Sequence, residues 1–142
     1  MLTGVGGLFA SCLNTFLMSI VLILVYKIKI VIGEKHALIS FPVLWLSFEY
    51  LHLNWDLTWS WLTLGNVFSD KTAWIQWYEY AGVLGGSLWV LTINTILYYA
   101  LRKFLSNQSL LKPLLFALVF LTIPLFISNS ILSNFQNLSK ES

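Results

Sequence analysis

Long stretches without charge dominate this sequence of 142 residues. No charged residue precedes Lys27, and the stretch 82–101 contains none. Charged residues make up only 10% of the chain, whereas soluble domains carry about 25%. The single cysteine excludes a disulfide scaffold, and a net charge of +2 argues against nucleic acid as a partner. An integral membrane protein is the class that remains.

The apolar stretches predict an all-α membrane protein with four transmembrane helices and an aromatic-rich outer loop. A spanning helix needs about 20 mostly apolar residues, and lipid offers no partners for backbone groups outside a helix or a closed barrel. The spans are expected at about 8–26, 37–53, 82–101 and 111–132. Residues 133–142 are expected to form a polar tail or linker.

The distribution of charge predicts how these spans are oriented. The links on either side of the central pair of spans hold six of the eight basic residues: Lys27, Lys29, Lys35, Arg102, Lys103 and Lys112. The link at 54–80, called here the outer link, holds three acids against Lys71. Because basic links stay in the cytoplasm, we expect the outer link and both ends of the chain to lie outside.

The outer link is far more aromatic than an ordinary loop. It contains five of the seven tryptophans: Trp55, Trp59, Trp61, Trp74 and Trp77. One interpretation is an aromatic belt, because indole rings favour the headgroup level of the bilayer. The other is a wall or portal for a lipid substrate, and the two are compatible. The portal candidates are Trp55, Trp59, Trp61, Gly65 and Asn66.

Polar and small residues within the spans are interpreted structurally. Glu49 is expected to anchor a neighbouring helix or backbone, since an acid in a membrane is usually paired or functional. Gly82 and Gly86 form a GxxxG that predicts close helix packing, and Asn94 is expected to hydrogen-bond across helices. Glu49 and His52 have the spacing of half a di-metal motif, but no second such pair occurs. No metal site is therefore expected, and no residue pattern points to a cofactor.

Three stretches, taken together, resemble the membrane part of the apolipoprotein N-acyltransferases, in wording similar to the Bacteroidetes branch. They are residues 42–51 (PVLWLSFEYL), residues 59–66 (WSWLTLGN), and Ile75-Gln76 followed by residues 82–87 (GVLGGS) and Asn94. Two residues depart from the pattern. Ser60 stands where many relatives have proline, and His52 stands where many have arginine.

The resemblance implies a fragment of an eight-span inner-membrane enzyme, covering spans four to seven. The family's periplasmic nitrilase-like domain, with its Glu-Lys-Cys triad, would follow residue 142. The implied reaction moves an acyl chain from phospholipid to the N-terminal diacylglyceryl-cysteine of a lipoprotein. No residue here matches that triad, so the chain alone is expected to be inactive. The alternative is a non-catalytic membrane protein that binds lipid or assists assembly.

Overall fold

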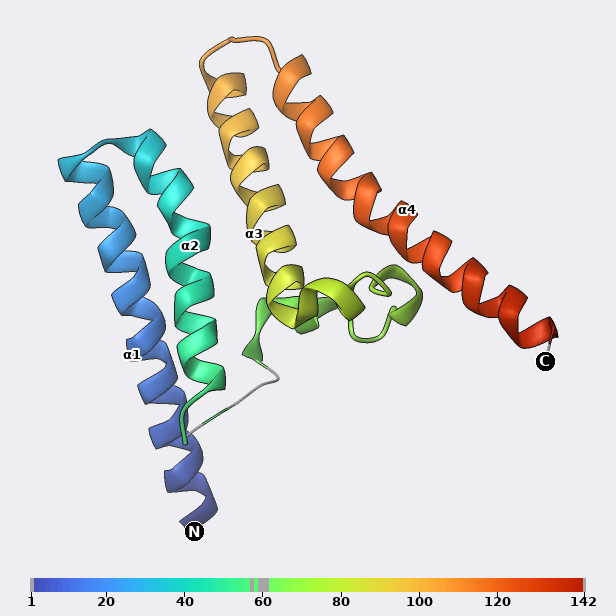
Figure 1. The fold of residues 1–142 in the computed structure, drawn as a ribbon. Coiled ribbons are helices and arrows are strands. Elements are labelled where there is room, and N and C mark those ends of the chain that lie inside the picture. The colour runs from blue at the N-terminus through green and yellow to red at the C-terminus, as the bar shows by residue number, and fades with distance from the viewer. Residues whose placement is uncertain (1, 57, 59–61, 142) are drawn as a thin grey trace. The chain divides into compact units, whose positions relative to one another are not determined.

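Helices account for nearly all of the ordered elements. The computed structural model describes the backbone of residues 2–56, 58 and 62–141, and the side chains of the same ranges between 6 and 137. The long helices are α1 (Leu2–Val31), α2 (Glu34–Leu53), α3 (Tyr78–Leu105) and α4 (Leu111–Glu141), and two short 3-10 helices, η2 (Leu64–Phe68) and η3 (Thr72–Trp74), precede α3 (Figure 1). No strand occurs in the described ranges. The all-helical prediction is therefore confirmed.

Within the described residues, three helices are long and apolar enough to cross a membrane. They comprise Gly6–Val31, Tyr78–Leu105 and Leu111–Asn137, and each extends beyond the predicted span. The helix α2 is not among them, because its polar residues, which include the buried Glu49 and His52, lower its mean hydropathy. The chain is thus a multi-pass membrane protein, and the crossing by α2 stays a prediction.

The chain divides into two compact units, Met1–Thr58 and Trp59–Ser142, each described by itself. In the first unit α1 and α2 form a helical hairpin (Figure 1). Gly33 makes the turn with a φ of 117°, a value that side chains disfavour, and its carbonyl accepts the N–H of Ala37 at 3.2 Å. Val21 and Ala37 are buried in this unit.

In the second unit α3 and α4 form another hairpin, and η2 and η3 pack beside the start of α3 and beside α4, respectively. The turn between the helices places Asn107 in the left-handed region, with a φ of 52°. The N–H of Gln108 reaches back to the carbonyl of Lys103 at 2.9 Å, as in a helix-ending Schellman turn. The polar end of the chain, predicted as a tail, continues α4 as helix to Glu141.

Candidate functional site

Four aromatic rings from the outer link and α3 form a connected group, called here the outer aromatic cluster: Phe68, Trp74, Trp77 and Trp89. Ring centroids are 6.3 Å apart for Phe68 and Trp74, and 5.1 Å apart for Phe68 and Trp89. Trp77 meets Trp89 edge-on at 5.9 Å. Trp89 is 6% exposed, whereas Trp74 is 47% exposed. The cluster therefore has a core on α3 and one open indole.

The predicted portal residue Gly65 is held on both sides of its backbone. Its N–H donates to the hydroxyl oxygen of Ser87 at 2.8 Å, and its carbonyl accepts the hydroxyl of Tyr78 at 2.9 Å. A Cβ at this position would overlap the backbone carbonyl of Val83 and lie 2.8 Å from that residue's Cγ2. Only glycine lets η2 approach α3 this closely.

Glycines near the start of α3 make a bend rather than a helix–helix contact. Gly82 has a φ of 65° and a ψ of −177°, which interrupts the helix, and no atom would lie within 4 Å of a Cβ there. A Cβ at Gly85 would lie 3.3 Å from the indole of Trp77, and one at Gly86 would overlap the hydroxyl of Tyr78. The GxxxG expectation assumed one continuous helix. Instead, the bend folds two aromatic side chains back onto α3.

Two fully buried serines fasten the outer link to the long helices. Ser87 of α3 and Ser128 of α4 are each 0% exposed. The hydroxyl of Ser128 donates to the carbonyl of Trp74 at 2.7 Å. Its oxygen accepts the backbone N–H of Trp77 at 3.4 Å. No structural role was predicted from the sequence for Tyr78, Ser87 or Ser128. For the two serines, the signal available in the sequence was a polar residue inside an apolar span.

The remaining portal candidates lie in different places. Asn66 donates its side-chain N–H to the hydroxyl of Thr63 at 2.8 Å, and Thr63 is buried. Trp55 belongs to the first unit, where its ring lies 5.4 Å from the ring of His52. Trp59 and Trp61 lie outside the described residues. Of the described candidates, Gly65 and Asn66 therefore belong to the second unit and Trp55 to the first.

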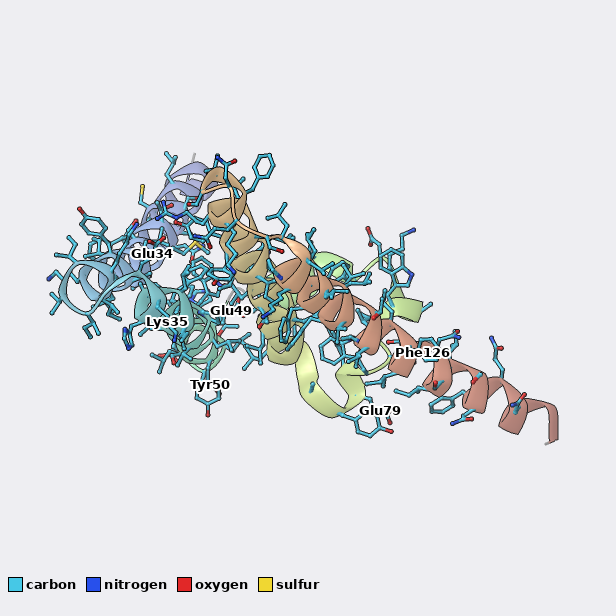
Figure 2. The ribbon with its side chains drawn as sticks, turned by 90° about the horizontal axis from the view of Figure 1, so that it is seen from above. Glu34, Lys35, Glu49, Tyr50, Glu79 and Phe126 are labelled. Carbon is cyan, nitrogen blue, oxygen red and sulfur yellow. The ribbon has the colours of Figure 1, made fainter. Side chains whose placement is uncertain are left out.

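The polar residues singled out inside the spans have partners on their own helices. Glu49 is 3% exposed and accepts the indole N–H of Trp45, one turn earlier on α2, at 3.0 Å. Figure 2 shows the next side chain, Tyr50, projecting away from α2, in keeping with its exposure of 58%. Asn94 is exposed and donates to the carbonyl of Val90 at 2.8 Å, where a bond across helices was expected. Within a helix, the carbonyl four residues earlier is an acceptor that lies within reach of an asparagine side chain.

The sequence also matches a known protein family. The sequence model described as "Apolipoprotein N-acyltransferase N-terminal domain" matches residues 1–96 of the chain. The chain belongs to this family. The match covers α1, α2, the outer link and α3 as far as residue 96, so Gly65, Ser87 and Trp89 lie within the family's N-terminal domain, whereas Ser128 lies beyond the matched range.

A curated relative supports the same assignment. The apolipoprotein N-acyltransferase of Chlorobaculum tepidum is 26% identical over 132 residues, which is 93% of this chain and 25% of the relative. The chain therefore spans about a quarter of the length of that protein. No solved structure matches the chain. The resemblance to the apolipoprotein N-acyltransferases is thus confirmed.

Within the described part of the chain, the residues bring together no three potential metal ligands from His, Cys, Asp and Glu. What the arrangement provides is a fixed, aromatic, partly exposed surface beside the start of α3. Its open indole and nearby polar backbone suit the boundary between acyl chains and headgroups.

Proposed function

We propose that this chain forms part of the membrane domain of an acyltransferase of the bacterial inner membrane. The substrates would be a phospholipid and a lipoprotein that carries an N-terminal diacylglyceryl-cysteine. The ester bond of the phospholipid breaks, an amide bond forms at the cysteine's α-amine, and lysophospholipid leaves. The observation that carries this proposal is the match of the family's N-terminal domain to residues 1–96.

In this proposal the outer link shapes the entrance for the phospholipid. The exposed indole of Trp74 and the rigid turn at Gly65 support it, because a lipid-facing wall must hold its shape against mobile acyl chains. Trp55, Trp59, Trp61 and Asn66 are the further candidates for this wall. Aromatic rings with one polar edge suit the depth at which the ester bonds lie.

The orientation follows from charge. The last turn of α3 holds Arg102 and Lys103, and the outer link precedes the opposite end of α3 (Figure 1). With basic links in the cytoplasm, the outer link and both ends of the chain face the periplasm.

Residues 1–142 alone are proposed to be inactive in acyl transfer. Covalent transfer needs a nucleophile, a base and an oxyanion-stabilising group within reach of one another. Cys12 is the one cysteine in this chain, and it lies exposed on α1. The domain therefore acts on the lipid by admitting and orienting it.

Complementation tests the proposal directly. The chain alone should not rescue a strain depleted of its acyltransferase, whereas the Chlorobaculum tepidum relative carrying this chain in place of its matched segment should. Rescue by the chain alone would contradict the inactivity. A chimaera that reaches the membrane at the parent's level but transfers no acyl chain would contradict the assignment of function.

A further inference from the structure

Ser128 connects α4 to the outer link through a single hydroxyl group. It contacts backbone groups 51 and 54 residues away in sequence, and its side chain is completely buried. By contrast, Ser130, on the same helix, is exposed and donates only to the carbonyl of Phe126 within α4, at 3.0 Å. Ser128 is thus a tertiary contact, and Ser130 is a matched local one.

The two backbone groups held by Ser128 frame the turn that leads from η3 into α3. The carbonyl belongs to Trp74, whose indole is the open ring of the outer aromatic cluster. The N–H belongs to Trp77, whose ring packs against Trp89 and Gly85 inside the unit. Ser128 therefore holds the backbone that carries the Trp74 indole, and the ring itself lies 6.3 Å from that of Phe68.

The helix α4 is itself held in place two turns before Ser128. The indole N–H of Trp89 donates to the carbonyl of Phe120 at 2.6 Å, and Phe120 precedes Ser128 by eight residues, or roughly two helical turns. This bond joins α3 to α4 below the turn. The hydroxyl of Ser128 is therefore presented at a defined height along α4.

From this geometry we infer that Ser128 is a positioning residue that fixes the turn at Trp74–Trp77 on α4 and so holds the Trp74 indole toward the ester region of a phospholipid. Without the hydroxyl, an apolar methyl group would face a carbonyl and an N–H inside the protein, and both would lose their partner. The turn would then open, and Trp74 would leave its orientation. The lipid part of this inference rests on the proposed function.

Labelling of the 142-residue chain tests the inference without any acyl transfer. The background replaces Cys12 with serine and introduces cysteine at the exposed Ala73, in vesicles of phosphatidylethanolamine and phosphatidylglycerol made permeable to a water-soluble maleimide. Ser128→Ala should raise the labelling rate at position 73 by about fivefold or more, the factor given by the loss of about one net hydrogen bond. Ser130→Ala should leave the rate unchanged. Cysteine at the exposed Ser109, in the turn before α4, should label at one rate in all variants if the hairpin stays folded.

A fluorophore at position 73 then reports on lipid. Phospholipid brominated near its ester bond should quench this fluorophore less in Ser128→Ala than in Ser130→Ala. Equal labelling rates in these two variants, or a change at Ser109 as large as that at position 73, would overturn the positioning role. A raised labelling rate with unchanged quenching would overturn the orientation toward lipid. Neither readout uses acyl transfer, so an inactive chimaera would refute the proposed function and leave the positioning role of Ser128 standing.

Discussion

The indole of Trp89 supplies the hydrogen bond that Pro124 cannot make. In a helix, the N–H of residue 124 would donate to the carbonyl of Phe120, but proline has no N–H. The Nε1 of Trp89 donates to that same carbonyl at 2.6 Å. A backbone group without a partner inside a membrane costs several kcal/mol, so this bond explains how α4 stays continuous across a proline. It also joins α3 to α4.

The first prediction compares the contributions to stability of Trp77 and Trp89, the two indoles that meet edge-on. Trp89→Phe keeps a ring but removes the N–H that Phe120 needs, and should destabilise the chain by about 1–3 kcal/mol. Trp77→Phe should cost less, because the indole N–H of Trp77 has no hydrogen-bond partner in the described part of the chain. Unfolding of each variant in mixed detergent micelles measures the difference. Equal losses for the two variants would contradict the assignment.

The second prediction concerns the coupling between Trp89 and Pro124. Pro124→Ala restores the N–H that bonds Phe120 within the helix. In that background Trp89→Phe should cost about 1 kcal/mol less than it does beside proline, as measured by a double-mutant cycle. A coupling energy of zero would mean that the indole does not replace the missing donor.

The third prediction concerns the carbonyl of Gly65. Tyr78→Phe removes the hydroxyl that donates to it at 2.9 Å, and should lower the free energy of unfolding by about 1 kcal/mol. The matched control is Tyr80→Phe, since Tyr80 is 78% exposed and lies on the same short segment. It should change nothing measurable. A loss at Tyr80 equal to that at Tyr78 would show that the hydroxyl contact with Gly65 contributes nothing.

The fourth prediction tests the orientation. Cysteine at Ser69 should react with a membrane-impermeant reagent added outside intact cells, in a background that replaces Cys12 with serine. Cysteine at Ser106 should react only after the cells are permeabilised. Both serines are exposed, so access to the reagent decides the outcome. Labelling of Ser106 but not Ser69 in intact cells would reverse the topology.

Composition and long uncharged apolar runs were sufficient to predict the helices. The absence of charge from these runs reflects the lipid environment directly. Three short motifs were enough to identify the family. The pairing of Glu49 with Trp45 was also within reach of the sequence, because residues four apart share a helix face. The prediction named only a neighbouring helix or backbone as what Glu49 anchors, because the presence of an acid in a span does not say where its partner lies.

The fastening of the outer link could not be predicted from local pattern. Ser87 contacts a residue 22 positions away, and Ser128 contacts residues more than 50 positions away. Such pairings depend on the tertiary fold rather than on spacing. The bend at Gly82 was missed for a related reason, since GxxxG carries no information about whether its helix is continuous.

We propose above that the outer link, fixed at Gly65, shapes the lipid entrance of an acyltransferase. The most direct measurement is acyl transfer per membrane-inserted molecule in the chimaera with the Chlorobaculum tepidum relative, comparing Gly65→Val with Gly7→Val. A Cβ at Gly65 overlaps the backbone of α3, whereas nothing lies within 4 Å of one at Gly7. We expect Gly65→Val, like Trp61→Ala in the same outer link, to lower transfer by about tenfold, or roughly 1.4 kcal/mol of barrier, and to lower the protein level by less. Gly7→Val should transfer as the parent does. Transfer at the parent's rate per molecule in both Gly65→Val and Trp61→Ala would contradict the claim and reduce the outer link to an aromatic belt.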